Sequence, residues 1–353
     1  MCLKISGMLQ KKKVKSYVAS GPTQARVNDN IISLRFLKRE ISLFWDCLAV
    51  AEIFFLCLRL KPDILHLHTS KAGFAGRMGG FMAGVKKIFY QPHGIVFYGY
   101  FSRLKSKIVL SAEKLLAPLA EKIIVLTPNA KREFLSYGVG KEKQFRILEN
   151  GICPENFNRD KKLKNQLRKK FHIKEDELVF GMAGRLVPLK GHRFFIKVFS
   201  KLVKTGSKTK AVIIGAGPED PGLKKVVEKY GLKDKVIFTG YRKDMEKAIQ
   251  LMDVLIQPSL VEGFGLTLIE AGAAGIPAVG FKVGGIRDII KNMYNGILVD
   301  CKDIKGIYKA MQYFIDNPAK VEDMGKNAKK RVQKHYTLDN MQKKLYRIYG
   351  LTT

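Results

Sequence analysis

Acidic residues are scarce in this chain, which has 31 Asp and Glu against 64 Lys and Arg and a formal net charge of +33. The excess is not a basic tail, since residues 1–150 already carry 25 basic residues against 10 acidic ones. Such a charge attracts anionic partners, namely phosphorylated substrates, an acidic membrane surface or nucleic acid. A generally Lys-rich, soluble protein is the plain alternative. Nucleic acid is disfavoured, because zinc-finger spacing, an RNP-type strand and a helix-turn-helix pattern are all missing.

Paired cysteines and long apolar runs are also missing. The chain has five cysteines and no C-x-x-C pair, which predicts free thiols in a reducing compartment. No signal peptide is recognised at the start. The longest apolar run, Cys47–Leu58, is interrupted by Glu52 and is shorter than the ~20 residues of a membrane span. We therefore expect a cytoplasmic protein, with a peripheral position on the inner face of the cell membrane left open.

Several motifs that carry catalytic chemistry are missing as well. There is no Asp-x-Asp to bridge Mg²⁺ or Mn²⁺ to a diphosphate. No G-x-S-x-G, G-x-x-x-x-G-K-[ST] or G-x-G-x-x-G stands in the required strand and helix context. His66 and His68 share one face of a predicted strand, but no third metal ligand accompanies them. The sequence therefore predicts no metal site and no cofactor.

What is present is a regular alternation of short apolar strands with helical patterns, which is typical of parallel α/β sheets. It predicts two doubly wound, Rossmann-like domains. The Asn150-Gly151 turn and the polar stretch after it favour a boundary near residue 154. We predict domains at 1–154 and 155–335, and a last helix at 336–353 that could pack back on the first domain. Strands are predicted at 16–19, 64–68, 87–91, 122–126, 145–148, 179–183, 210–215, 236–239, 254–257, 278–281 and 296–299.

The most informative stretch runs from Leu260 to Asp288 and places two carboxylates around a glycine turn. Glu262 precedes the turn and Glu270 lies one helical turn into the helix that follows. A helix that begins at this turn directs free amides outward, which makes its first turn an anion site. Glu270 could then bind a ribose diol and Glu262 a sugar hydroxyl, although two acids could equally serve as helix-start residues. The turn and the first helical residues are Gly263, Phe264, Gly265, Leu266 and Thr267.

Two basic residues follow the strand predicted at 179–183. Arg185 and Lys190 lie on a turn punctuated by glycine and proline, at the carboxyl end of a parallel strand, where ligands of such sheets bind. A guanidinium and an ammonium there would neutralise a diphosphate and stabilise it as a leaving group. Further strand-end turns, which could approach a base or ribose or be simple tight turns, are at Gly215, Gly240 and Tyr241.

The first half offers weaker candidates. His93 ends a strand in Gln91-Pro92-His93-Gly94 and could touch a transferred sugar, or merely anchor its loop. The helix start at 70–73, with Lys71, could hold a phosphate of an acceptor. Aromatic residues at 97–101 precede Arg103, Lys105 and Lys107, a combination that suits an anionic membrane surface or a partly buried loop.

Taken together, these motifs resemble the retaining GT-B glycosyltransferases of family 4 (glycosyl transferases group 1), in particular members that build bacterial surface polysaccharides. The matching features are GRLVPLKGH, the spacing of Glu262 and Glu270, GGIRD, His93-Gly94 and Asn150-Gly151, in the family's order. The likeness runs from about residue 16 to the end of the chain. PDILHLHTSKAGFAGR carries the polysaccharide resemblance.

The resemblance implies a metal-independent transfer from a nucleotide sugar, with UDP as the expected nucleotide, to a glycan or lipid-linked glycan. Arg185 and Lys190 would bind the diphosphate, Glu270 the ribose and Glu262 the donor sugar, while His93 would lie near the anomeric carbon. Front-face transfer would leave no role for an enzyme nucleophile. The donor sugar, the acceptor, the linkage and the oligomeric state stay open.

The chain departs from the family pattern at its start, where an apolar strand and a Gly-Gly loop are expected and residues 1–15 instead have a helical pattern. We therefore expect one N-terminal βα unit to be missing, which would weaken the first domain because neighbouring strands lose a partner. An inactive remnant that still binds a nucleotide sugar is the alternative that this departure leaves open, and a basic nucleic-acid binder is a third.

Overall fold

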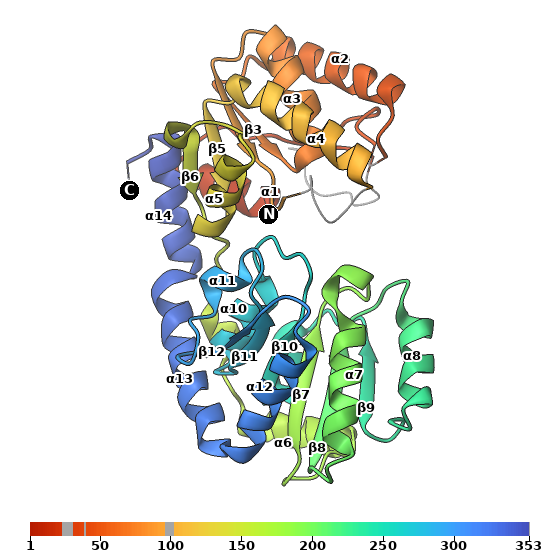
Figure 1. Ribbon diagram of the computed structural model, residues 1–353. Coiled ribbons are helices and arrows are strands. Elements are labelled where there is room, and N and C mark those ends of the chain that lie inside the picture. The colour runs from red at the N-terminus through yellow and green to blue at the C-terminus, as the bar shows by residue number, and fades with distance from the viewer. Residues whose placement is uncertain (23–30, 39, 96–101, 353) are drawn as a thin grey trace. The chain divides into compact units, whose positions relative to one another are not determined.

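The structure is a computed structural model that describes residues 1–22, 31–38, 40–95 and 102–352 (Figure 1). It divides into two compact units. Unit 1 is Met1–Glu149 with Met341–Thr353, and unit 2 is Asn150–Asn340. The boundaries predicted from the sequence were residue 154 and residue 336. In this division the last segment begins at Met341, later than predicted, and it is part of unit 1.

Unit 1 contains two parallel sheets. A four-stranded sheet has the order β3-β4-β5-β6, and a separate pair is formed by β1 and β2. The strands are β1 (Val18–Ser20), β2 (Ile31–Ser33), β3 (Ile64–His68), β4 (Lys87–Gln91), β5 (Lys122–Val125) and β6 (Phe145–Ile147). The helices are α1 (Cys2–Gln10), α2 (Leu43–Leu60), α3 (Ser70–Met82), α4 (Arg103–Leu116), α5 (Pro128–Ser136) and, from Met341 on, α14 (Leu338–Tyr349), with one-turn 3₁₀ helices at Ala117–Leu119 and Glu142–Gln144.

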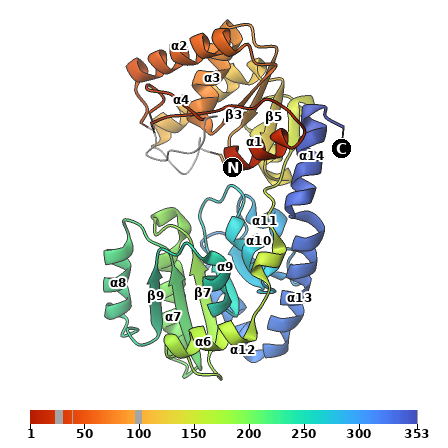
Figure 2. The same ribbon diagram turned by 180° about the vertical axis from the view of Figure 1, so that it is seen from behind.

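Helices α2, α3 and α4 lie side by side in unit 1 (Figures 1 and 2). A buried ion pair joins α3 to α4, with Arg77 Nη2 2.8 Å from Glu113 Oε2. The hydroxyl of Tyr90, from strand β4, donates to the other carboxylate oxygen of Glu113 at 2.7 Å. Arg77 also donates from Nε to the carbonyl of Gly73, at 2.8 Å. Because both charges are buried and hydrogen-bonded, this cluster fixes the two helices to the sheet.

Unit 2 is one six-stranded parallel sheet with helices on both faces. Its strand order is β12-β11-β10-β7-β8-β9. The strands are β7 (Leu178–Ala183), β8 (Thr209–Ile214), β9 (Val236–Gly240), β10 (Val254–Gln257), β11 (Ala278–Phe281) and β12 (Gly296–Val299). The helices are α6 (Lys161–Lys170), α7 (His192–Val203), α8 (Asp220–Lys229), α9 (Met245–Ala248), α10 (Leu266–Ala273), α11 (Ile286–Ile289), α12 (Ile304–Asp316) and α13 (Pro318–His335), with 3₁₀ turns at Pro154–Phe157, Pro188–Lys190 and Ile249–Leu251.

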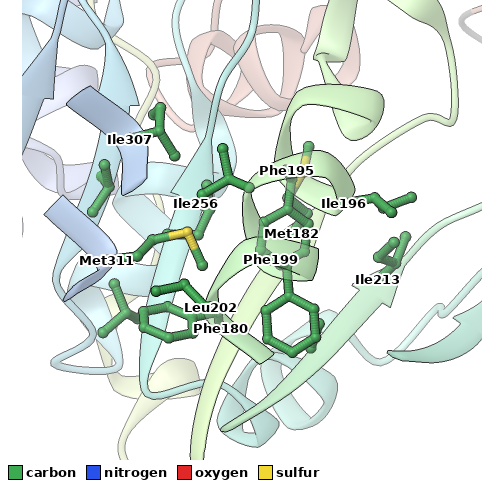
Figure 3. Close-up of a cluster of buried hydrophobic side chains, with 14 of the residues drawn as sticks. Phe180, Met182, Phe195, Ile196, Phe199, Leu202, Ile213, Ile256, Ile307 and Met311 are labelled. Carbon is green, nitrogen blue, oxygen red and sulfur yellow. The ribbon is translucent and has the colours of Figure 1, made fainter. Parts of the chain in front are cut away.

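The main core of unit 2 lies between this sheet and helices α7 and α12 (Figure 3). Strand β7 supplies Phe180 and Met182, helix α7 supplies Phe195 and Phe199, and α12 supplies Met311. Each of these side chains is at most 1% exposed. A fully buried side chain of this size contributes roughly 1.5–3 kcal/mol. The core therefore holds the central strands firmly, and with them the loops at their carboxyl ends.

The fold class predicted from the sequence is confirmed, since both units are Rossmann-like with parallel sheets. Every predicted strand is present, with ends that differ by no more than two residues. Strand β2 was not predicted. It is short, the residues before it are polar, and two of its three residues are only half-buried. The helical pattern at the start of the chain forms α1.

Candidate functional site

The strand order of unit 2 reverses between β7 and β10. From β7 the chain passes to β8 and β9 on one side, and from β10 it passes to β11 and β12 on the other. The loops that leave these two central strands therefore lie next to each other at the switch point, on the carboxyl edge of the sheet, where open α/β sheets bind ligands. Residues 184–191 follow β7 and residues 258–265 follow β10, so both motifs singled out in the sequence are at this point.

The two loops contact each other through their backbones. The amide of Leu260 donates to the carbonyl of Leu189 at 2.8 Å. Lys190 ends the 3₁₀ turn Pro188–Lys190, and Gly191 is the N-cap residue of helix α7. Since the Leu260–Leu189 bond fixes one loop against the other, the side chain of Lys190 is held next to the loop that carries Glu262.

Lys190 and Glu262 form an ion pair, with Nζ 2.7 Å from Oε2. The same carboxylate oxygen accepts a hydrogen bond from Gln257 Nε2 at 3.0 Å and a longer one from Ser259 Oγ at 3.4 Å. Gln257 and Ser259 are almost fully buried, and they also bond to each other at 2.8 Å. The Glu262 carboxylate is therefore held in one place by three neighbours, while a quarter of the Lys190 side chain stays exposed.

The second glycine turn, Gly284-Gly285, packs against this loop. The amide of Gly285 donates to the carbonyl of Glu262 at 3.0 Å. Gly284 has φ of +44°, and a Cβ at that position would collide with the same carbonyl oxygen. Only glycine allows so close an approach. The GGIRD motif therefore supports the backbone of Glu262 from the side of β11.

Helix α10 begins at Leu266, directly after the turn, as predicted. Gly265 precedes it with φ of +99°, a left-handed conformation that other residues adopt at a cost. The helix cannot pair its own first amides, so those of Leu266 and Thr267 are available to an anion. Thr267 Oγ1 lies 3.5 Å from the carbonyl of Ala183, which places the first turn of α10 at the end of β7. Glu270, half-buried, is one turn further along the helix.

The remaining strand-end residues predicted in unit 2 lie around the same edge of the sheet. Arg185 is exposed, two residues after the end of β7. The amide of Gly215, after β8, donates to the carbonyl of Gly240, the last residue of β9, at 2.9 Å. Tyr241 is 72% exposed. Since β8 separates β9 from β7, the turn at Gly240 and Tyr241 is two strand spacings, roughly 10 Å, from the switch point.

In unit 1, His93 belongs to a cluster of three histidines. His68 Nδ1 and His93 Nε2 share a hydrogen bond of 2.8 Å, and His66 Nδ1 shares one of 2.8 Å with the hydroxyl of Tyr349 in α14. The rings of His66 and His68 are 4.2 Å apart, centroid to centroid. Burial, with help from the neighbouring histidines, lowers the pKa of His66 to about 3 and that of His68 to about 2. Burial also lowers the pKa of His93 to about 4.

These values mean that all three imidazoles are neutral at physiological pH. A neutral ring can accept one hydrogen bond and donate another, which suits contact with sugar hydroxyls better than contact with a phosphate. Among the residues that the structure describes, no group of three or more His, Cys, Asp or Glu side chains is arranged to hold a metal ion. The predicted contact of His93 with a sugar stays a prediction.

Two other sites were predicted in unit 1, one at Lys71 and one in the aromatic and basic stretch at 97–107. Lys71, at the start of α3, pairs with the carboxylate of Asp46 in α2 and donates to the carbonyl of Glu40. Its ammonium is therefore engaged within unit 1. The aromatic residues at 97–101 lie outside the described residues, whereas Arg103, Lys105 and Lys107 are exposed at the start of α4.

Three residues of these clusters were not predicted from the sequence, namely Gln257, Ser259 and Tyr349. The first two were recognisable in part, because a buried strand that ends in a polar Gln-Pro-Ser is unusual for a core segment. Tyr349 lies far from His66 in sequence, and nothing in the sequence pattern connects the two.

Two family models match the chain. The model described as "Glycosyltransferase Family 4" matches residues 5–156, and the model described as "Glycosyl transferases group 1" matches residues 164–331. The structure has the fold of GT-B glycosyltransferases, two Rossmann-like units in one chain. The chain is therefore a glycosyltransferase of the GT-B fold, and the resemblance seen in the sequence is confirmed to that extent.

The relatives agree with this class. The chain is 25% identical over 335 residues to the UDP-Gal:alpha-D-GlcNAc-diphosphoundecaprenol alpha-1,3-galactosyltransferase of Escherichia coli, covering 94% of this chain and 86% of that protein. It is 26% identical over 350 residues to the capsular polysaccharide biosynthesis glycosyltransferase CapM of Staphylococcus aureus, covering 97% and 91%. The solved structure of Anabaena Alr3699/HepE in complex with UDP superimposes with a TM-score of 0.76 at 21% identity, over 85% of this chain and 81% of that one.

The support that Gly284 gives to Glu262 predicts the effect of Gly284→Ala. The added Cβ meets a backbone carbonyl that cannot move without shifting the Glu262 loop, so we expect the free energy of unfolding of unit 2 to fall by about 2–4 kcal/mol. Gly206→Ala is the control, because Gly206 also has positive φ but has no neighbouring atom within 4 Å of a Cβ. It should cost about 1 kcal/mol. Urea unfolding compares the two, and equal losses would contradict the packing argument.

The histidine cluster predicts that acidification lowers the free energy of unfolding already at a pH where most carboxylates are still ionised. Unfolded histidines take up protons below about pH 6.5, while the folded cluster stays neutral, so stability is present above that pH and is lost as the pH falls toward 4. We expect the free energy of unfolding to be about 2 kcal/mol or more lower at pH 5 than at pH 7.5. We expect His68→Asn to make the free energy of unfolding depend less on pH. His172→Asn, at an exposed position, should leave the pH dependence unchanged. Identical pH profiles for the two variants would contradict the role given to the cluster.

Proposed function

We propose that this protein transfers a sugar from a UDP-sugar to a glycan or lipid-linked glycan, without a metal ion and with retention of the anomeric configuration. The observation that carries the proposal is the convergence of Lys190, Glu262 and the first turn of α10 at the switch point of unit 2. Two cationic side chains and a helix terminus suit a diphosphate, and fixed carboxylates suit sugar hydroxyls.

The donor would be held in three parts. The diphosphate is bound by Arg185, Lys190 and the free amides of Leu266 and Thr267. Glu270 accepts hydrogen bonds from the ribose diol. The strand-end turns at Gly215, Gly240 and Tyr241 border the space for the base, which the exposed ring of Tyr241 could cover.

Glu262 has two tasks in this proposal. Its Oε2 is engaged by Lys190, Gln257 and Ser259, so a hydroxyl of the donor sugar is expected at Oε1. The pair with Lys190 also orients the ammonium in the free enzyme. Since Lys190 has three N–H donors, it can bind a phosphate oxygen while it keeps a bond to Glu262.

In the transfer step, the bond between the anomeric carbon and the diphosphate oxygen breaks, and its electron pair leaves with UDP. The acceptor oxygen bonds to the anomeric carbon on the same face, and the acceptor proton passes to the departing diphosphate. Arg185, Lys190 and the α10 terminus stabilise the negative charge that grows on the leaving group. The Escherichia coli relative, by its name, acts on a UDP-sugar and a diphospholipid-linked sugar, which supports this choice of donor and acceptor.

Substitutions at the two halves of the donor site test the proposal. Lys190→Met and Glu270→Gln should each lower kcat/KM about a hundredfold or more, because each removes a contact that the leaving group or ribose requires. Lys197→Met and Glu228→Gln, at exposed positions of unit 2, serve as matched controls and should leave it unchanged. The assay follows UDP release from UDP-glucose, UDP-galactose and UDP-N-acetylglucosamine with an N-acetylglucosaminyl diphospholipid as acceptor.

Other outcomes separate the alternatives. Unchanged turnover in both site variants would overturn the site assignment. An inverted anomeric centre in the product, measured from the anomeric proton coupling, would overturn retention alone. UDP binding with no transfer from any donor would favour the inactive, nucleotide-sugar-binding alternative.

A further inference from the structure

Helix α4 carries apolar side chains on its outer face as well as on its inner one. Leu104, Ile108 and Leu115 are 70%, 61% and 77% exposed. Their spacing of four and seven residues puts them, with Ser111, on a single stripe roughly 16 Å long. The opposite side of the helix already faces the unit 1 core through Leu110 and Leu116. The outer stripe therefore is not covered by the described residues of unit 1, and the inner side chains are the ones that hold the helix in place.

Basic residues flank this stripe. Arg103, Lys107 and Lys114 lie along one side of it and Lys105 along the other, and all four are exposed. The one acidic residue of α4, Glu113, is buried and paired with Arg77. The outer face of α4 is thus apolar in the middle and positively charged at both edges, which is the pattern of a helix that lies in a membrane interface.

Helix α2, which packs beside α3 in unit 1, carries a second exposed apolar stripe. Phe44, Phe55 and Leu58 are 65%, 66% and 45% exposed, and their spacing places them on one stripe. Its two acidic residues are turned toward the protein. Asp46 pairs with Lys71, and Glu52 accepts from the backbone amides of Arg35 and Phe36 at 2.7 and 3.0 Å. The outer stripe of α2 consequently has no acidic charge that would repel an anionic surface.

We infer that the α2–α4 face of unit 1, defined by the exposed stripes of these two helices, docks on an anionic lipid bilayer. In the described part of the chain no helix is both long and apolar enough to cross a bilayer, so the face would lie on the surface. Residues 41–119 carry ten Lys and Arg against four Asp and Glu, three of which are engaged as described. This charge favours acidic lipid over a second copy of the chain, which would bring the same positive face and a net charge of +33.

Vesicle sedimentation tests the docking face without any assay of transfer, so its failure is separate from failure of the proposed function. The whole protein is mixed with vesicles of phosphatidylcholine alone or with phosphatidylglycerol added. We expect binding to the anionic vesicles, weakened by salt, and little binding to the neutral ones. Equal binding to both, or none to the anionic vesicles, would overturn the inference.

Two variant sets locate the face. Leu104→Gln/Ile108→Gln/Leu115→Gln removes the apolar stripe, and Arg103→Gln/Lys105→Gln/Lys107→Gln removes flanking charge. Each should weaken binding on the order of tenfold to a hundredfold. Lys201→Gln/Lys204→Gln/Lys305→Gln lowers the net charge by the same amount at exposed sites of unit 2 and should have a much smaller effect.

All substituted side chains are exposed, and unchanged melting by circular dichroism confirms that the variants fold. Equal loss of binding in the control set would show that net charge alone drives association and would overturn the assignment to this face. The inference would also be overturned if sedimentation equilibrium showed a dimer and the variant without the apolar stripe were monomeric, because this face would then bind a second copy of the chain.

Discussion

The fixed position of the Glu262 carboxylate is the constraint on which the proposed donor site depends. Its side chain is held by Lys190, Gln257 and Ser259, and its backbone carbonyl by Gly285. These contacts come from the loops after β7, β10 and β11, so one residue joins the ends of three neighbouring strands. A ligand that binds at the switch point meets a carboxylate and an ammonium already in place, which lowers the entropy cost of ordering these side chains during binding.

The sheet topology explains why this junction lies where it does. Because the strand order reverses between β7 and β10, the chain leaves these two adjacent strands for opposite halves of the sheet, and the loops that follow them meet at its carboxyl edge. The α10 terminus then faces the end of β7, as the contact of Thr267 with Ala183 shows. Basic side chains after one strand and a helix terminus after the other thus lie close together, although about 80 residues separate them in sequence.

The strands and the positions of the site motifs could be predicted from the sequence, because apolar periodicity and glycine turns are local signals. The start of α10 after Gly265 is an example. The ion pair of Lys190 with Glu262 could not be predicted, since it depends on how two loops far apart in sequence pack at the switch point. The contact of His66 with Tyr349 is similar, because it joins residues 283 positions apart. Strand β2 was missed because three residues, two half-buried and one exposed, carry almost no periodic signal.

The two units differ in the kind of chemistry that they offer. Unit 2 presents charges and backbone amides, as a diphosphate requires. Unit 1 presents neutral imidazoles and an outer face of apolar and basic side chains, which are suited to a sugar and to a lipid surface respectively. A sugar and a lipid diphosphate offer the chemical groups that these features suit, and the excess of positive charge in both units favours anionic molecules.

The central claim is that protein groups alone bind the donor diphosphate. Isothermal titration calorimetry of the whole protein with UDP, in EDTA and again with Mg²⁺ or Mn²⁺, tests it most directly. If Arg185, Lys190 and the α10 terminus neutralise the diphosphate, the Kd for UDP should agree within about twofold in all three conditions. Loss of UDP binding in EDTA, with recovery on addition of a divalent cation, would contradict the account.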